Sequence, residues 1–237
     1  MQGASRAYIA GCFAILVSAC GGGKYSGAPP SANFDLQTGI SKMVTNGLSA
    51  NVAFSGTATV NGVSHTFTGS GTFTRPPAVS ATFNATLASS QTTTVAGTIT
   101  VAGQTSPYST SVTDYYASSD SALLGEVSSS EFDVAQAPIV FPTMVVGGSS
   151  GTLGTLTRYT DSTMSVSLGT AQVSYSVMAP VDPGSPIGVA VTTKIYDTQN
   201  TLIETDVTNY TMTSSDVISL SSGSAQTQSG MLTLTVQ

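Results

Sequence analysis

The stretch from Val52 to Phe73, VAFSGTATV-NG-VSHTFTGSGTF, alternates apolar or small residues with Ser and Thr on both sides of Asn61-Gly62. A period of two is typical of a β-strand that buries one face. Asn-Gly between two such runs predicts a type I′ hairpin turn, because this turn needs a positive φ at both central residues. The stretch therefore predicts an antiparallel hairpin.

The turn also predicts the register of this hairpin. If Val60 pairs with Val63, Gly56 lies opposite Phe67, and His65 lies beside Ala58 on the apolar face. The same register places Gly69 opposite Phe54, so both of these glycines have an aromatic ring as their cross-strand neighbour, which is a favourable pairing.

Similar short alternating runs, broken by Gly, Pro, Asn and Asp, continue along the chain. Helices that could connect parallel strands are missing between them, so the pattern predicts an all-β fold, an antiparallel meander that forms a curved sheet, barrel or sandwich. One short helix is expected within 35–48, where apolar residues recur at helical spacing before Asn46-Gly47. The further strands are expected at 79–87, 95–101, 108–116, 123–127, 153–159, 164–168, 173–179, 189–195, 203–212 and 232–236.

Two internal similarities suggest repetition. Residues 56–62 (GTATVNG) recur as 97–103 (GTITVAG), and residues 116–126 resemble 196–204. One interpretation is a β domain of two similar halves, 51–136 and 144–237. The other is that strands rich in Ser and Thr resemble one another by chance.

The composition limits the classes of partner. The chain of 237 residues has a net charge of −6 and only 8% charged residues. An acidic protein is a poor partner for nucleic acid, which demands a basic patch. With 40% hydrophobic residues, the chain can still fill a real core.

The N-terminal segment indicates export. Residues 7–19 form an apolar run too short to cross a bilayer, which needs roughly 20 apolar residues. They end in Val17-Ser18-Ala19-Cys20, which resembles the lipobox of bacterial lipoprotein precursors. The alternatives are an ordinary secretory signal and an uncleaved anchor.

The resemblance implies that residues 1–19 are a signal peptide, that cleavage occurs between Ala19 and Cys20, and that Cys20 carries the lipid. Gly21 stands where an Asp would retain such lipoproteins in the inner membrane, so the resemblance implies an outer-membrane location. Residues 20–34 hold the lipidated cysteine and a linker rich in Gly, Pro and Ser, with the β domain at 35–237. The membrane is thus the expected partner, through the lipid on Cys20, and a protein or glycan partner is unknown. Beyond the linker, the chain looks like Ser/Thr-rich β lipoproteins of uncharacterised function.

Few residues could support catalysis or metal binding. Cys12 lies in the expected signal peptide and Cys20 is the expected site of lipid attachment, so the mature chain is expected to have no thiol nucleophile, thiolate ligand or disulfide. His65 is the only histidine, and a hydrolase would need it beside a serine and an acid such as Asp114. Neither a catalytic residue nor a cofactor is expected.

Metal and sugar sites have weak support. Calcium could use pairs of acids, but these are expected to be solvated turn residues, and no calcium-loop spacing occurs. Tyrosines could replace the missing tryptophan as a sugar platform, although most tyrosines in strands are half-buried in the core. No metal site is therefore expected. The acids considered are Asp114, Asp120, Glu131, Asp133, Asp197, Glu204 and Asp206, with Asn200 beside them.

Three hypotheses for function remain. The first is a non-enzymatic, lipid-anchored envelope protein that acts as an interaction or structural module. The second is a carrier or chaperone for an apolar ligand, with room left by small residues on the apolar face: Gly56, Ala58, Gly69, Gly71, Ala81, Ala85 and Gly97. Phe54, Phe67, Phe73 and Phe83 could instead fill that room. A hydrolase ranks last.

Overall fold

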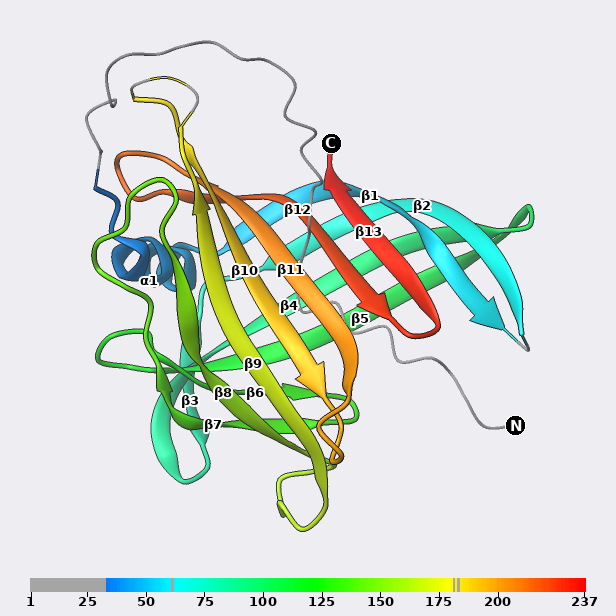
Figure 1. The fold of residues 1–237 in the computed structure, drawn as a ribbon, viewed down its shortest axis with the longest axis horizontal. Helices are drawn as coiled ribbons and strands as arrows, with labels where there is room; N and C mark the ends of the chain where they lie inside the picture. Colours follow the sequence, from blue (N-terminus) through cyan, green and yellow to red (C-terminus); the bar gives the residue numbers. More distant parts are fainter. Residues whose placement is uncertain (1–32, 61, 181, 183) are drawn as a thin grey trace.

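The computed structural model describes residues 33–60, 62–180, 182 and 184–237, which form one antiparallel sheet and a short helix. Strand β2 pairs with β4 as well as with β1, so the sheet closes into a barrel of twelve strands, with β3 as an extra strand beside β4 (Figure 1). The predicted all-β antiparallel meander is confirmed, and among the three forms considered it is a barrel. The elements are α1 (Leu36–Asn46), β1 (Leu48–Val60), β2 (Val63–Arg75), β3 (Val79–Phe83), β4 (Thr86–Val101), β5 (Gln104–Ala117), β6 (Leu123–Ser128), β7 (Phe132–Ile139), β8 (Ser150–Tyr159), β9 (Ser167–Met178), β10 (Ile187–Tyr196), β11 (Leu202–Met212), β12 (Ile218–Thr227) and β13 (Gly230–Val236).

The first hairpin has the predicted register. Val60 pairs with Val63, and Gly56 lies opposite Phe67. The Phe67 ring lies directly over Gly56, because a Cβ built on this glycine would come within 2.6 Å of the ring. Gly62 has the expected positive φ of 78°, whereas Asn61 is outside the described residues.

Gly62→Val is therefore expected to lower the free energy of unfolding by about 1 kcal/mol or more. Nothing lies within 4 Å of the added Cβ, so the loss comes from backbone strain alone. Thr66→Val, at an exposed position of the same hairpin, is the control and should change stability by less than about 0.5 kcal/mol. Urea melts measure both losses. If Thr66→Val lost more stability than Gly62→Val, the assignment of the residues of this hairpin to the inner and outer faces would be wrong.

The predicted strand at 79–87 is wrong, because it contains a second tight hairpin. Asn84 and Ala85 both have positive φ, and Phe83 pairs with Thr86 across this turn. From residue 79 to residue 87, small or apolar residues alternate with Ser, Thr and Asn without a break. The sequence pattern therefore gives no sign that the chain reverses direction at the two-residue turn. Strand β4 consequently begins at Thr86 instead of residue 95.

Three other segments also differ from the prediction. The strand expected at 164–168 is mostly a turn, in which Met164 has a positive φ of 54°, and β9 begins only at Ser167. Strands β7 and β12 were not predicted. Their inward positions include Asp133, Gly223 and Ala225, so hydrophobicity does not alternate clearly along them.

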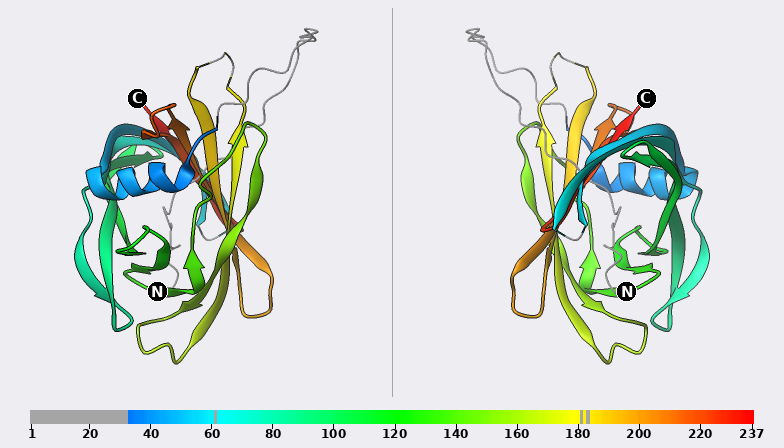
Figure 2. Two further views of the ribbon diagram at one scale, coloured as in Figure 1. Left: turned by 90° about the vertical axis from the view of Figure 1, so that its left-hand side faces the viewer. Right: turned by 90° about the vertical axis from the view of Figure 1, so that its right-hand side faces the viewer.

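Helix α1 lies inside the ring near one end of the barrel, between strands from opposite sides (Figure 2). It confirms the helix predicted within 35–48. Asp35 caps its first turn by accepting from the Thr38 backbone N–H at 2.9 Å, and Gly47 ends it with a φ of 76°. Gly39 allows close approach to the wall, because a Cβ there would come within 2.9 Å of Ile218. Among the described residues, no helix is long and apolar enough to cross a membrane.

The two faces of the barrel strands differ in composition. Inward positions hold the main core, which gathers around α1, and the outward positions of the first hairpin are mostly Ser and Thr. A smaller cluster lies outside the ring, where Phe83 stacks on Tyr115 and Phe132 at centroid distances of 4.6 and 5.1 Å. Ala81 and the exposed Ala85 belong to the β3–β4 hairpin over this outer cluster. The carrier hypothesis expected these two residues to line the interior, but they do not.

Candidate functional site

The middle of the barrel interior holds charged side chains, here called the charged belt. It contains six of the chain's twelve acids and two arginines, and nearly all of these side chains are buried. Burying a charge is costly unless it is paired or neutralised, so this arrangement must be balanced internally. The charged belt consists of Arg75, Asp114, Glu126, Glu131, Asp133, Arg158, Glu204 and Asp206.

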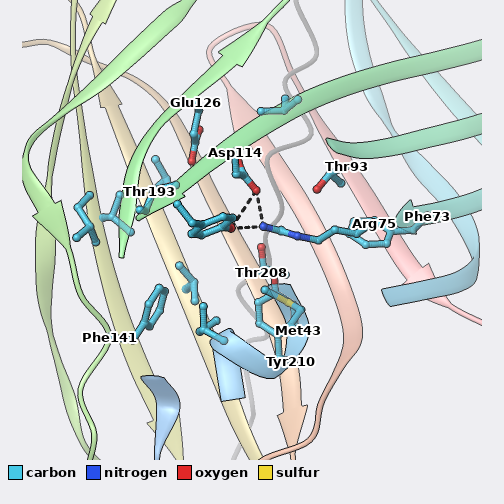
Figure 3. Close-up of a pocket in the computed structure, with 17 residues that line it drawn as sticks. Met43, Phe73, Arg75, Thr93, Asp114, Glu126, Phe141, Thr193, Thr208 and Tyr210 are labelled. Carbon is cyan, nitrogen blue, oxygen red and sulfur yellow. Dashed lines mark hydrogen bonds and ion pairs between the residues drawn. The ribbon is translucent and has the colours of Figure 1, made fainter. Parts of the chain in front are cut away.

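Arg75 organises one side of the charged belt. Its guanidinium contacts both the Asp114 carboxylate and the Tyr116 hydroxyl (Figure 3). Its Nε also donates to Gln91 Oε1 at 2.7 Å. Tyr116 in turn donates to Asp114 at 3.2 Å. Burial raises the pKa of Asp114, although the charge of Arg75 opposes this shift. A small cavity of about 100 Å³ separates this group from Met43 of α1.

Gln91 links the charged belt to the helix. While its Oε1 accepts from Arg75, its Nε2 donates to the carbonyls of Met43 and Val44 at 3.1 and 3.2 Å. These carbonyls belong to the last turn of α1, and each also accepts from a backbone N–H at 2.9 Å, Met43 from Gly47 and Val44 from Ala78. The Gln91 side chain therefore joins the helix end to the arginine.

The second arginine lies among acids. Arg158 donates to Glu131 at 2.5 Å, and its Nε is 3.8 Å from Asp133. Burial, with the neighbouring Glu131, raises the pKa of Asp133 to about 7. Burial likewise raises the pKa of Glu204 to about 7, and burial together with Glu204 raises the pKa of Asp206 well above its usual range. Several carboxyls of the charged belt therefore keep a proton near neutral pH.

The charged belt overturns the expectation that these acids are solvated turn residues. Asp114, Glu131, Asp133, Glu204 and Asp206 are all buried. By contrast, Asp120 and Asp197 do lie in turns, where their carboxylates accept from nearby backbone N–H groups. Within the described part of the chain, no three acidic or histidine side chains converge so as to hold a metal ion.

The structure does not bring the hydrolase candidates together. His65 lies beside Ala58, as predicted, but Arg75, the partner of Asp114, is ten residues further along β2. That length of strand spans about 33 Å. Residues 147–151 have the Gly-x-Ser-x-Gly spacing, yet they lead into strand β8, whose first residues are Ser150 and Gly151, instead of joining a strand to a helix, as a nucleophile elbow does. Ala19 and Cys20 lie outside the described residues.

A larger pocket lies at the end of the barrel away from α1, here called the hairpin-end pocket. The turns that follow β1, β4 and β12 meet at this end (Figure 1). The pocket has a volume of about 470 Å³, within the range of small-molecule sites. It is lined mostly by apolar side chains, with Thr and Ser at the β12–β13 turn: Phe54, Thr57, Ala58, Phe67, Ile99, Val101, Tyr108, Ile203, Ala225, Thr227, Gln228, Ser229, Gly230, Met231 and Leu232.

Glycines allow the wall beside this pocket to curve. Gly71 pairs with Gly97 across β2 and β4, and a Cβ on Gly71 would come within 2.1 Å of the Ala96 carbonyl. Such close approach bends the sheet, as glycine kinks do in barrels. The aromatic residues then line the space: Phe54 packs edge-on against Tyr108 at 5.8 Å, and the Phe67 ring covers Gly56.

Tyr108 holds a buried polar group beside the hairpin-end pocket. Its hydroxyl is buried and has no hydrogen-bond partner within the described part of the chain. Burial raises the pKa of Tyr108 to about 12, so this hydroxyl keeps its proton. The hydroxyl oxygen is inaccessible even to water, so Tyr108 lines the pocket with its ring and not with its oxygen.

Most of these functional positions could not be identified from the sequence. The pocket joins Phe54 to Leu232, because β1 pairs with β13 at opposite ends of the chain. Arg75 did carry a signal, since it continues the inward positions of β2 two residues after Phe73. A charged residue on an apolar face indicates a buried partner.

Comparison with known proteins adds no functional evidence. No family model matches this chain, and searches of curated proteins and of solved structures find no match either.

Proposed function

We propose that this protein is a non-enzymatic carrier that holds an apolar ligand in the hairpin-end pocket while a lipid on Cys20 tethers it to the outer membrane. The observation that supports a carrier is the pocket itself, about 470 Å³ in volume and lined mainly by apolar side chains. An apolar cavity of this size with a few polar groups is the usual form of a small-molecule site.

The closed barrel also suits a carrier mechanically. At the pocket, β1 and β13 are hydrogen-bonded to strands on both sides, whereas β5 pairs only with β4 around Tyr108, because its pairing with β6 begins at Val112. The charged belt lies deeper in the interior and is unsuited to apolar chains. A ligand is therefore expected to enter at the hairpin end and to stop before the charged belt.

Uptake of the neutral fluorescent probe N-phenyl-1-naphthylamine tests the carrier. A chain starting at residue 21 contains every described strand and the helix, so it serves as the soluble form. We expect Ala58→Phe to weaken probe binding at least about tenfold, because the new ring fills the pocket. Thr59→Phe is the matched control, since the neighbouring side chain is exposed on the outside of the same strand, and it should leave binding unchanged.

Two outcomes would contradict the carrier. If the unmodified chain takes up no probe, and native mass spectrometry finds no co-purifying apolar molecule, the carrier proposal fails. If Thr59→Phe weakens binding as much as Ala58→Phe does, the probe binds elsewhere.

The tether is a separate proposal with its own test. Cells that express the full chain should incorporate a clickable fatty acid into the protein, and the label should be lost in Cys20→Ala. The labelled protein should fractionate with the outer membrane. An unlabelled wild-type protein found in the soluble fraction would refute the tether and would leave the carrier proposal intact.

A further inference from the structure

We infer that the ligand of the hairpin-end pocket is an extended polypeptide segment of a partner protein, which adds as an antiparallel strand to the free edge of β5 and places apolar side chains in the pocket. This inference rests on the proposed carrier function and names the chemical class of its ligand. Two features support it: the free edge, which fits a peptide backbone, and the position of the pocket beside this edge.

The free edge of β5 comprises residues 104–111. Within the described part of the chain, no strand other than β4 pairs with them, because the pairing of β5 with β6 begins only at Val112. The β4–β5 hairpin extends beyond β6 at this end (Figure 1). Six of the eight side chains are exposed, so the edge is open to solvent. An open edge of this kind is a template for a further strand.

The β4–β5 turn determines which backbone groups of the edge are free. Residues 102 and 103 form a two-residue turn with positive φ at both positions, so Val101 and Gln104 form a hydrogen-bonded pair, and the two kinds of pair alternate from there. The residues that consequently direct their backbone groups away from β4 are Thr105, Pro107, Ser109 and Ser111. Pro107 agrees with this assignment, since proline has no N–H to donate to β4. Each of the others offers an N–H and a carbonyl, which is the pattern that an added strand completes.

The hairpin-end pocket lies on the inward side of this edge. Its lining residues come from seven strands that are consecutive in the sheet, from β11 through β12, β13, β1, β2 and β4 to β5. Tyr108 is the lining residue of β5, and the strands that follow in the sheet, β6 to β10, contribute none. The pocket wall therefore ends at the free edge, and a strand added there would continue the wall.

This geometry determines the side chains of the segment. In an antiparallel pair, directly opposed residues share a face, so segment residues opposite Ser106, Tyr108 and Thr110 point inward and the residues between them point outward. The inward side chains meet a mainly apolar pocket, and the outward ones lie beside exposed Ser and Thr side chains of β5. The fitting segment therefore alternates apolar residues with Ser or Thr.

Charge restricts the segment further. Neither residues 104–111 nor the described residues that line the pocket include a charged side chain. Asp206 and Glu204 of the charged belt lie directly opposite the lining residues Ala225 and Thr227. An acidic side chain in the pocket would thus lack a counter-charge and lie close to further acids, which is unfavourable. The segment is expected to contain no Asp or Glu.

Displacement of the naphthylamine probe by the uncharged peptide acetyl-Ser-Val-Thr-Val-Ser-Val-Thr-amide tests this class. We expect the peptide to displace the probe, because its valines enter the pocket. A copy with N-methyl groups on its Ser and Thr residues should compete at least about tenfold worse, since these residues face β5 and lose their donors. A copy N-methylated on the valines is the matched control and should compete like the unmodified peptide, because those N–H groups point away from β5.

Proline variants assign the binding to the edge. Ser109→Pro removes a free N–H without removing a bond to β4, so the peptide should compete about tenfold worse while the probe itself still binds. Ser80→Pro is the matched control: this exposed residue has the corresponding position on β3, which pairs only with β4 and does not line the pocket. It should leave competition unchanged. Pro107→Ala adds an N–H to the edge and should strengthen competition about threefold to tenfold.

Three results would overturn the inference: a peptide that fails to displace the probe, equal competition by the two methylated peptides, or a Ser109→Pro variant that binds the peptide as well as Ser80→Pro does. Each of them leaves the carrier standing with a ligand of another class. Absence of probe binding by the unmodified chain would instead remove the carrier itself.

Discussion

Replacing Arg75 by methionine is expected to lower the free energy of unfolding by about 3–5 kcal/mol. The guanidinium is the partner of Asp114, Tyr116 and Gln91 in the interior, and all four side chains are buried. Methionine keeps much of the volume but leaves the Asp114 carboxyl without a counter-charge. Urea melts of the chain from residue 21 measure the loss, provided that the free energy of unfolding has the same slope against urea concentration in both proteins.

Two further variants test whether the loss of stability comes from the unpaired charge of Asp114 or from the substitution as such. Lys42→Met removes an ion pair with Asp216 that is longer, at 3.7 Å, and largely exposed, so it should cost less than about 1 kcal/mol. The double variant Arg75→Met with Asp114→Leu should recover more than half of the loss, because it removes the unpaired charge as well. A single Arg75→Met variant as stable as Lys42→Met would show that the buried pair contributes little.

Raising the pH from about 5 to about 8 is expected to destabilise the barrel by several kcal/mol. Burial raises the pKa of Asp133 and of Glu204 to about 7, and it also raises the pKa of Asp206 and of Glu126 well above the usual range of a carboxyl group. Within this range the folded state keeps protons that the unfolded chain releases. The stabilising contribution is therefore complete below about pH 4 and is lost as the pH rises through 7.

The expected loss for Asp133 and for Glu204 is on the order of 2 kcal/mol each over this range. The groups that face them are Glu131, Arg158 and Asp206, so the two titrations are linked. Asp133→Asn and Glu204→Gln should each flatten the curve of unfolding free energy against pH. Asp161→Asn is the control: this carboxyl is exposed, and hydrogen bonds from Thr163 lower its pKa, so it stays ionised throughout. A stability that rises between pH 5 and pH 8 would contradict the charged belt as described.

The elements that could be predicted from the sequence are those whose cause is local. Asn61-Gly62 predicted the first hairpin, and the Val60–Val63 pairing followed directly from it. Asn46-Gly47 likewise predicted the end of the helix, where Gly47 has its positive φ. In both cases, neighbouring residues alone provide the turn geometry.

The prediction failed where one local pattern fits two structures. Alternation through Phe83, Asn84 and Ala85 looks the same in a continuous strand as in a hairpin with a two-residue turn. Strand β7 was missed because Asp133 points inward and Phe132 packs on the outer cluster. Strands usually have the apolar residue inside and the charged residue outside.

By itself the sequence determined the all-β class, the period of two, the first hairpin with its register, and the short helix, because backbone sterics and side-chain alternation act between near neighbours. Only the tertiary structure decided that the sheet closes, since this needs β2 to meet β4 past the β3 hairpin, and β1 to meet β13 at the far end of the chain. Closure also decided which acids are buried. Asp120 and Asp114 are the same residue type six positions apart, yet one lies in a turn and the other faces Arg75, because only the enclosed interior withholds water from a carboxylate.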